Sequence, residues 1–359
     1  MRLARSAAAP EGFARRLMQW HARHGRHDLP WQGTRDPYRV CLSEVMLQQT
    51  QVATVRSYYV RFLQRFSDVR ALAAAPLDDV LALWSGLGYY SRARNLHLCA
   101  QAVVGQHQGE FPRSSAALVE LPGIGRSTAA AIAAFCFDER AAILDGNVKR
   151  VLTRVLGFGD DLAEARNEKR LWALAESLLP PRGVAIYTQA LMDLGATVCL
   201  AREPRCDACP AASSCVALGE GRIAAYPLKT RRLKRSHRSH SLLCLQRGKR
   251  LWLTQRPAVG VWAGLWSLPE FDSAEALMAL ATAWPGGAQW LPAFKHKLTH
   301  LDLALAPCRW TLPTRLAAAR IVAIEAALVS AAGPGRWVTS DEALLMGLPA
   351  PIRKLIEQW

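Results

Sequence analysis

The chain has 359 residues, of which 51% are hydrophobic, and this length is sufficient for two domains with separate cores. Lys and Arg number 45 against 29 Asp and Glu, which gives a formal net charge of +16. This excess argues against a neutral metabolic enzyme and favours a polyanionic partner, with nucleic acid as the first candidate. The excess is densest in residues 219–238, which carry seven basic residues and one acidic residue.

The N-terminal residues 1–10 are rich in Arg and Ala, but they contain no continuous apolar core before a small-residue cleavage site. We therefore expect a frayed terminus and no signal peptide. No uninterrupted apolar run in the sequence reaches the length that is needed to span a bilayer. The sequence predicts a soluble, cytoplasmic protein with no membrane partner.

Helical patterns follow one another from residue 11 to about residue 182, with apolar residues three and four positions apart. Turn signals such as Asp36-Pro37 and Pro122-Gly123 separate these patterns, and strand-like alternation is absent from this part of the sequence. We expect an all-α domain over residues 1–218.

The pattern changes from Ser241 onward. Short apolar, β-branched and aromatic runs at 242–245, 251–254 and 298–305 lie between Gly and Pro residues, and a helical pattern covers 274–283. These features predict a smaller α+β domain over 239–359. The basic stretch 219–238 is predicted to be a linker, either solvated or in contact with phosphate groups; its central basic residues are Lys229, Arg231, Arg232, Lys234 and Arg235.

One acid and several amides interrupt an otherwise apolar, helix-like run at residues 43–51, SEVMLQQTQ. At 3.6 residues per turn, Glu44, Gln48 and Gln51 fall on one side of such a helix. Burial statistics alone favour a solvated helix face and a buried functional acid about equally.

The segment LPGIG at 121–125 separates two helical patterns, at 114–120 and 126–137. Gly123 and Gly125 permit a tight hairpin whose bare backbone can approach another surface closely. The N–H groups at the start of the second helix can then bind an anion such as a DNA phosphate. In a basic chain, this arrangement indicates a helix-hairpin-helix motif.

Asp145 stands in LDGNVKRVL, residues 144–152, directly before a helical run. An Asp in this position is most often the N-cap of the helix that follows. It is also the second carboxylate that a site containing Glu44 could use.

Four of the nine cysteines are spaced as Cys-x6-Cys-x2-Cys-x5-Cys, namely Cys199, Cys206, Cys209 and Cys215. Disulfides are rare in intracellular proteins, so this spacing predicts a metal centre. Structural zinc sites usually combine two Cys-x2-Cys pairs, and this loop has one, which favours a 4Fe–4S cluster without excluding zinc. The other cysteines are isolated in apolar surroundings and are predicted to be core residues: Cys41, Cys99, Cys136, Cys244 and Cys308.

Six stretches resemble the MutY family of adenine DNA glycosylases, within the helix-hairpin-helix and endonuclease III superfamily. They are LPW (29–31), SEVMLQQTQ (43–51), GLGYYSRARN (86–95), LPGIGRSTA (121–129), LDGNVKRVL (144–152) and the cysteine loop. The hairpin and the cysteine loop are common to the superfamily, whereas SEVMLQQTQ and GLGYY narrow the resemblance to this family. The resemblance covers nearly the whole chain.

The resemblance implies a fold: an all-α helix-hairpin-helix glycosylase domain with a 4Fe–4S cluster loop, followed by a C-terminal α+β Nudix-like domain. It also implies a base-excision-repair enzyme that hydrolyses the N-glycosidic bond of adenine mispaired with 8-oxoguanine or guanine. The product is an abasic site. The implied partner is double-stranded DNA containing A·8-oxoguanine or A·G mispairs, bound by a monomer that is nucleoid-associated in a bacterium.

The resemblance further implies catalytic roles. Glu44 matches the general acid that protonates N7 of an adenine flipped out of the duplex. Asp145 matches the carboxylate that faces the oxocarbenium-like sugar, either as an electrostatic partner or as a transient nucleophile. Asn147 would help to orient Asp145, and Trp31 and Gln189 resemble the lining of the adenine pocket.

Other residues resemble those that contact the DNA around the lesion. Gln49 and Tyr89 match the pair that enters the duplex beside the lesion, and Thr50 and Leu87 match residues near the 8-oxoguanine. The alternative for Tyr89 and its neighbour Tyr90 is a pair of core aromatic residues. Base stacking of the kind implied for Tyr89 contributes roughly 1–3 kcal/mol.

Ser127 stands where bifunctional relatives carry the Lys that forms a Schiff base with the sugar. A hydroxyl cannot form that imine, so we expect a monofunctional glycosylase without strong lyase activity. An endonuclease III-type glycosylase and lyase is the enzymatic alternative, which Ser127 and the second domain disfavour. A non-catalytic iron–sulfur DNA-binding regulator is the other alternative, and two carboxylates facing phosphate groups would be unfavourable in such a protein.

The C-terminal part resembles a Nudix-like domain through GVWAGLWSLP at 260–269. The REx2Ex2 pattern that holds Mg²⁺ in phosphohydrolases of this fold is absent from the sequence, so we expect recognition and no hydrolysis. The family's Phe-Ser-His loop corresponds to Leu298, Thr299 and His300. A hydroxyl and an imidazole remain for hydrogen bonding to 8-oxoguanine, whereas the aromatic ring is lost.

Overall fold

A computed structural model describes residues 12–230 and 234–358. It divides into two compact units, one made of Met1–Ala73 and Leu98–Arg232 and the other of Ala74–His97 and Leu233–Trp359. We call them the helical unit and the sheet unit. The predicted frayed terminus at 1–10 lies outside the described residues, as do Arg231 and Arg232 of the predicted linker.

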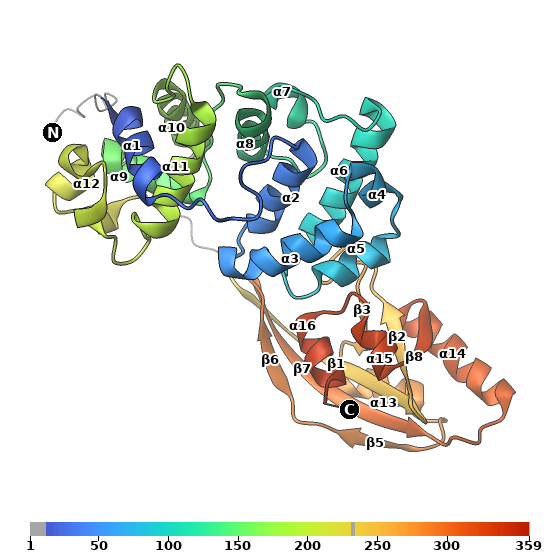
Figure 1. Cartoon of the computed structure of the whole chain (residues 1–359). Coiled ribbons are helices and arrows are strands. Elements are labelled where there is room, and N and C mark those ends of the chain that lie inside the picture. Colours follow the sequence, from blue (N-terminus) through green and yellow to red (C-terminus); the bar gives the residue numbers. More distant parts are fainter. Residues whose placement is uncertain (1–11, 231–233, 359) are drawn as a thin grey trace. The chain divides into compact units, whose positions relative to one another are not determined.

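From residue 12 to residue 230 the structure contains helices and turns only (Figure 1). The all-α prediction for this part is therefore confirmed. The α-helices of the helical unit, including α4 and α6 at its joins with the sheet unit, are α1 (Phe13–His24), α2 (Pro37–Leu47), α3 (Val52–Arg65), α4 (Val69–Ala74), α6 (Ser91–His107), α7 (Ser115–Leu118), α8 (Arg126–Phe137), α9 (Gly146–Leu156), α10 (Ala165–Ser177), α11 (Val184–Thr197) and α12 (Val216–Gly219). Three short 3-10 turns are η1 (Cys206–Ala208), η2 (Ala212–Ser214) and η3 (Ile223–Ala225).

Packing between α1, α8, α9 and α11 forms the main core of the helical unit. The α9 sequence places Val148, Val151, Leu152 and Val155 three and four residues apart, and all four side chains are buried. Complete burial of an aliphatic side chain of this size contributes about 1.5–3 kcal/mol. The core therefore fixes the position of α9 and of the Asp145 residue that precedes it.

The stretch 43–51 is not one continuous helix, contrary to the prediction. Helix α2 begins with Asp36 as its N-cap and Pro37 in its first turn, and it ends at Leu47. Gln49 has a φ of 57°, in the left-handed region, and α3 begins only at Val52. Consecutive amide and hydroxyl side chains offer no apolar face that would hold another helical turn against the core. Gln49 and Thr50 therefore lie in a turn, not on the helix of Glu44.

The sheet unit contains eight strands and the remaining helices. The strands are β1 (Ser236–Arg247), β2 (Arg250–Gln255), β3 (Trp266–Ser267), β4 (Glu270–Phe271), β5 (Gly287–Trp290), β6 (Phe294–Lys297), β7 (Leu301–Leu312) and β8 (Gly335–Thr339). The helices are α5 (Leu77–Trp84), α13 (Ala274–Ala281), α14 (Ala318–Ala332), α15 (Ser340–Leu344) and α16 (Ala350–Ile356).

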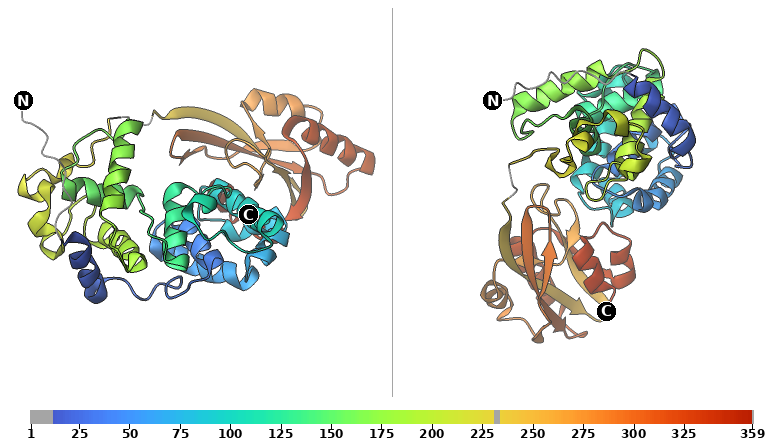
Figure 2. Two further views of the ribbon diagram at one scale, coloured as in Figure 1. Left: turned by 90° about the horizontal axis from the view of Figure 1, so that it is seen from above. Right: turned by 90° about the vertical axis from the view of Figure 1, so that its left-hand side faces the viewer.

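The sheet is built on a long parallel pair, β1 and β7, in the order β3-β2-β1-β7-β5. Side chains of β1 alternate between the two faces, because successive residues in a strand point to opposite sides. Leu242 and Cys244 belong to a core with α15 and α16, whereas Leu243 and Leu245 belong to a core with α13 and α14. Helices thus cover both faces, as Figure 2 shows, and the α+β prediction is confirmed.

Two predicted boundaries differ from the structure. Strand β1 begins at Ser236, inside the stretch 219–238 that was predicted to be a linker. The predicted strand 298–305 begins only at Leu301, because residues 298–300 form the turn of the β6–β7 hairpin. This turn leaves Thr299 and His300 exposed. Among the described residues, no helix is long and apolar enough to cross a membrane.

Candidate active site and DNA-contacting residues

A groove of about 1440 Å³ in the helical unit brings together residues that lie far apart in the sequence. Its walls come from the loop before α2, from α2 itself, from the first turns of α8 and α9, and from α11. Eight residues that the sequence predicted as site residues line it: Trp31, Glu44, Gln49, Thr50, Ser127, Asp145, Asn147 and Gln189.

Glu44 is the acid with the most perturbed environment in this groove. It lies on α2, between the buried residues Ser43 and Val45, and its side chain faces the groove. Two causes raise the pKa of Glu44 to about 8: burial, which is the larger, and the negative charge of Asp145, which is the smaller. A carboxyl group with this pKa is largely protonated at neutral pH and can donate a proton.

Asp145 is the N-cap of α9, the role that an Asp directly before a helix most often has. Its Oδ1 accepts hydrogen bonds from the backbone N–H groups of Asn147 at 2.7 Å and Val148 at 2.8 Å. Among the described residues, no group donates a hydrogen bond to Oδ2. The cap therefore fixes the carboxylate while leaving one oxygen for the groove that Asp145 lines.

Asn147 contacts Asp145 through its backbone, not through its side chain. The Asn147 Oδ1 atom instead accepts a hydrogen bond from the Arg150 guanidinium at 2.8 Å. Arg150 also donates to the carbonyl oxygens of Gly195 and Cys199, at 2.7 and 2.8 Å. Arg150 therefore ties the first turn of α9 to the end of α11 and to the first cysteine of the loop.

Ser127 braces the segment that carries Asp145. Its Oγ accepts a hydrogen bond from the backbone N–H of Leu144 at 3.0 Å.

The start of α8 is open to a ligand. The helix begins at Arg126, Gly125 is its N-cap, and no side chain caps it. A Cβ atom added at Gly125 would meet nothing within 4 Å, so the backbone there is open to a large ligand. Gly123 has a φ of 77°, which only glycine adopts without strain.

Gln189, on α11, has its amide group oriented by a buried acid. The Gln189 Nε2 atom donates to Oδ1 of Asp193 at 2.9 Å, and Asp193 is fully buried. Arg26 donates to the same carboxylate from its backbone N–H and from its guanidinium, at 2.6–2.8 Å. Because a carboxylate only accepts hydrogen bonds, the Gln189 carbonyl oxygen is directed away from it. Trp31 is buried and packs edge-on against Tyr59, with the ring centroids 5.5 Å apart.

Sequence reasoning missed Arg26, Arg150 and Asp193. Asp193 carries the same signal as Glu44, an acid inside an apolar helical run, and this signal could have identified it. The roles of Arg26 and Arg150 depend on partners far away in the sequence, and no local pattern marks them.

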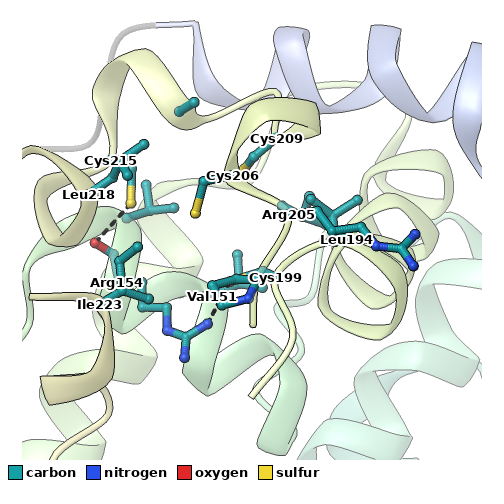
Figure 3. Close-up of a pocket in the computed structure, with 14 residues that line it drawn as sticks. Val151, Arg154, Leu194, Cys199, Arg205, Cys206, Cys209, Cys215, Leu218 and Ile223 are labelled. Carbon is teal, nitrogen blue, oxygen red and sulfur yellow. Dashed lines mark hydrogen bonds between the residues drawn. The ribbon is translucent and has the colours of Figure 1, made fainter. Parts of the chain in front are cut away.

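The four predicted metal ligands lie around one small cavity next to α9 (Figure 3). Turn η1 begins at Cys206, and Cys209 and Cys215 directly follow η1 and η2. Among the described residues, no three Cys, His or acidic side chains lie close enough together to hold a single metal ion. The thiols are instead spread around the cavity, which is otherwise mostly apolar.

Arg154 covers one side of this cavity. Its guanidinium donates to Sγ of Cys199 at 3.4 Å and to the carbonyl oxygen of Leu200 at 2.6 Å, and its own carbonyl oxygen accepts from Sγ of Cys215 at 3.4 Å. A positive donor beside thiolates fits a negatively charged iron–sulfur centre, whose sulfurs accept such hydrogen bonds. The donor set and its surroundings therefore suit the predicted cofactor.

The remaining predicted residues lie in the sheet unit. Tyr89 is 45% exposed, and its hydroxyl forms a hydrogen bond of 2.8 Å with Oγ1 of Thr299. Leu298, for which the resemblance implied a Phe, is half-buried and packs against the core of the unit. Leu87 and Tyr90 are buried. The structure thus joins the GLGYY segment to the β6–β7 turn, two stretches more than 200 residues apart.

Two protein families match separate parts of the chain. A profile for HhH-GPD superfamily base excision DNA repair proteins matches residues 42–177, and a profile for the NUDIX domain matches residues 240–358. The first range contains Glu44, Ser127 and Asp145, and the second contains Thr299 and His300.

Curated relatives match most of the chain. An adenine DNA glycosylase of Buchnera aphidicola subsp. Baizongia pistaciae (strain Bp) is 35% identical over 350 residues, which cover 96% of this chain and 95% of the relative. The adenine DNA glycosylase of Rattus norvegicus is 40% identical, with coverage of 82% and 65%. The Homo sapiens enzyme of the same name is 36% identical, with coverage of 98% and 75%.

Solved structures resemble the helical part. A thermostable thymine-DNA glycosylase superposes with a TM-score of 0.52 at 29% identity, covering 58% of this chain and 95% of that one. A non-covalent endonuclease III–DNA complex gives a TM-score of 0.50 at 23% identity, covering 58% and 94%, which shows the shared fold alone. With the relatives that match nearly end to end, these results show that the chain is a DNA glycosylase of base excision repair and belongs to the adenine DNA glycosylase family.

Proposed function

We propose that this enzyme removes adenine mispaired with 8-oxoguanine or guanine and leaves an abasic site. The observation that carries the proposal is the pair of carboxylates in one groove: Glu44 has its pKa raised to about 8, and Asp145 is held by two backbone donors. Two acids with different environments are the usual means of cleaving a glycosidic bond.

In the proposed reaction, adenine leaves the base stack and enters the groove, because its glycosidic bond is inaccessible inside the duplex. Protonated Glu44 donates its proton to N7, so the base departs as a neutral molecule. As the bond breaks, positive charge develops on the sugar, and the Oδ2 atom of Asp145 faces it. Asp145 acts either by stabilising this charge or by forming a transient bond to the sugar, before water completes the hydrolysis.

Gln189 is proposed to recognise adenine by its exocyclic amino group. Asp193 engages the Gln189 amide nitrogen, which leaves the Gln189 carbonyl oxygen as an acceptor toward the groove. The N6 amino group of adenine is a donor, whereas O6 of guanine is an acceptor. This polarity favours adenine over guanine in the pocket, and Trp31 supplies an apolar wall.

Recognition of the opposite base is proposed for the exposed residues of the β6–β7 turn. Thr299 and His300 offer a hydroxyl and an imidazole, and Tyr89 offers a partly exposed ring for stacking. Gln49 and Thr50, in the turn after α2, are proposed to contact the duplex at the edge of the groove. The start of α8, with Gly123 and Gly125, is proposed to bind a DNA phosphate.

The reaction is proposed to stop at the abasic site. Schiff-base chemistry needs an amine, and no lysine is found among the described residues that line the groove. The Ser127 side chain, whose hydroxyl accepts a hydrogen bond from the Leu144 backbone N–H, has no nitrogen and cannot replace that amine. This supports a monofunctional enzyme.

Cys199, Cys206, Cys209 and Cys215 are proposed to hold a 4Fe–4S cluster. Thiols spread around a cavity suit a cluster of several irons better than one zinc ion, which needs all four sulfurs within a single tetrahedron. When bound, such a cluster crosslinks the loop that follows α11 and so supports the contacts that Arg150 and Arg154 make with it.

A glycosylase assay tests the proposal. The enzyme is incubated with duplexes containing A·8-oxoguanine, A·G, A·T or T·G pairs, and alkali then cleaves any abasic site. We expect cleavage at adenine in the first two duplexes only, and strand scission only after alkali. Excision of thymine from the T·G duplex would contradict the proposed substrate, and efficient covalent trapping of DNA by borohydride would contradict the monofunctional reaction.

A further inference from the structure

A short segment of the Nudix-like part, Met346–Leu348, makes close contact with the GLGYY segment. We call residues 86–90 the tyrosine loop. The Leu348 carbonyl oxygen accepts hydrogen bonds from the Tyr90 hydroxyl at 2.9 Å and from the Ser85 hydroxyl at 3.3 Å. Leu348 is fully buried, so this carbonyl oxygen is a fixed acceptor below the loop.

The same segment packs directly on helix α5, which precedes the tyrosine loop. A Cβ atom added at Gly347 would lie 3.0 Å from Cβ and 3.1 Å from the backbone carbon of Leu81. The Gly347 carbonyl oxygen is itself fixed by the backbone N–H of Trp266 at 2.9 Å. Glycine at 347 therefore permits a close approach to α5, and any side chain at this position would require neighbouring atoms to shift.

Asp78, in the first turn of α5, adds a second attachment. Its two carboxylate oxygens accept hydrogen bonds from the Trp266 indole at 3.1 Å and from the Gln255 amide at 3.2 Å. Arg94 lies in α6, which follows the loop in the sequence, and its guanidinium donates to the Ala263 carbonyl oxygen at 2.8 Å. The tyrosine loop is thus held on both flanks by residues of the sheet unit.

The loop itself has a conformation that needs such support. Gly86 and Gly88 have φ values of 104° and 71°, and Tyr89 has a φ of 47°, which is unfavourable for a residue with a bulky side chain. The Tyr90 hydroxyl also accepts a hydrogen bond from the Gly86 N–H at 3.4 Å. One buried hydroxyl therefore closes the loop and ties it to Leu348 at the same time.

We propose that Tyr90 is a positioning residue for Tyr89: through the Leu348 carbonyl oxygen, the Nudix-like part sets the loop conformation that presents the Tyr89 ring to damaged DNA. This inference rests on the proposed function of Tyr89 in contacting the lesion. It assigns the C-terminal part an indirect contribution to lesion recognition, in addition to the direct one proposed for Thr299 and His300.

The test uses Tyr90→Phe in the full-length protein, with Glu44→Gln present so that the duplex is not consumed. Tyr90→Phe removes the two hydrogen bonds and keeps the ring. We expect the affinity for an A·8-oxoguanine duplex to fall about tenfold, the effect of losing buried hydrogen bonds at a strained loop. Tyr187→Phe is the matched control, because the buried Tyr187 hydroxyl has no hydrogen-bond partner among the described residues.

The decisive comparison repeats Tyr90→Phe in a Tyr89→Ser background. If Tyr90 acts through Tyr89, the second substitution causes no further loss of affinity there. An equal loss in both backgrounds, or no loss in either, would overturn the proposal. If Tyr89→Ser alone leaves affinity unchanged, the DNA-contacting role of Tyr89 fails and this proposal with it, whereas adenine excision tests the glycosylase reaction separately.

Hydrogen exchange separates a loosened loop from an unfolded protein. In the Tyr90→Phe variant we expect faster amide exchange in residues 85–90 and unchanged exchange in β1 and β7. If exchange rises throughout the sheet unit, Ser85→Ala replaces Tyr90→Phe, since it removes the other hydrogen bond to Leu348 and leaves the Tyr90 ring in place. No change in affinity or in loop exchange with that variant would also count against the proposal.

Discussion

The negative charge of Asp145 acts on Glu44, and together with burial it raises the pKa of Glu44 to about 8. The Oδ1 atom of Asp145 is held by two backbone N–H groups in the first turn of α9. The groove therefore combines an acid whose pKa is raised with a second carboxyl group that backbone donors hold in place. This division matches the two tasks of breaking a glycosidic bond, donating a proton to the base and stabilising charge on the sugar.

Adenine excision should fall as the pH rises through about 8. The Glu44 carboxyl is protonated below its pKa of about 8 and loses its proton above it, so the general acid disappears on the alkaline side. The measurement is the single-turnover rate of adenine release from pH 6 to pH 10 at constant ionic strength. A rate that stays constant up to pH 10 would show that Glu44 does not supply the proton.

Glu44→Gln should stabilise the fold, and more so at pH 8.5 than at pH 5. In the unfolded chain Glu44 ionises near its ordinary pKa of 4.5, whereas in the native protein it resists ionisation up to about 8. The free energy of unfolding of the wild type therefore decreases between these two values, and glutamine, which does not titrate, removes this loss. Thermal unfolding should show a midpoint gain at pH 8.5 at least about 3 °C larger than at pH 5. An equal gain at both pH values would contradict the raised pKa.

Asp145→Asn should separate the helix-capping role of Asp145 from its proposed catalytic role. An asparagine oxygen can still accept the N–H groups of Asn147 and Val148, so the thermal unfolding midpoint should change little. Loss of the charge facing the sugar should lower the excision rate by about 10²- to 10³-fold. Asp145→Ala, which removes both functions, is the control and should also lower the unfolding midpoint. Wild-type excision by the Asn variant would remove Asp145 from the mechanism.

Gln189→Leu should remove the enzyme's dependence on the amino group of adenine. With the wild type, replacing adenine by purine, which lacks this group, should lower the excision rate, because the Gln189 carbonyl oxygen is left without a donor. In the Leu variant the two substrates should react at similar, reduced rates. Comparing the rates of the wild type and the Leu variant on adenine and on purine isolates the contact between Gln189 and the adenine amino group. A preference for adenine over purine that survives the substitution would exclude Gln189 as its reader.

The purified protein should contain four iron and four sulfide ions per chain, and Cys206→Ala should lower this content. Loss of the cluster removes the support of the loop that holds Arg150 and Arg154, so lesion binding and the unfolding midpoint should fall together. Metal analysis with Cys308→Ala as control checks this, since Cys308 is an isolated, buried cysteine of the sheet unit. Stoichiometric zinc in place of iron would contradict the assignment.

Local patterns predicted the helical and α+β parts and the positions of Glu44, Asp145 and the four cysteines. These features depend on spacing and capping within one segment. The turn at Gln49 was missed, because the polar stretch 48–51 also fits a solvated helix face and no local pattern marks the end of α2 at Leu47. Arg150 and Gly347 were missed because their partners lie on other segments, and such contacts leave no periodicity in the sequence. Asp193 was overlooked although it is an acid inside an apolar helical run, the same signal that marked Glu44.

The most direct test of the account is the single-turnover release of adenine from an A·8-oxoguanine duplex by the wild type and by Glu44→Gln, with duplex binding measured in parallel. The amide keeps the size of the side chain but cannot donate the proton. We predict a rate at least about 10²-fold lower, with the affinity for the duplex retained. Adenine release by Glu44→Gln at the wild-type rate would contradict the central claim that Glu44 is the general acid of this enzyme.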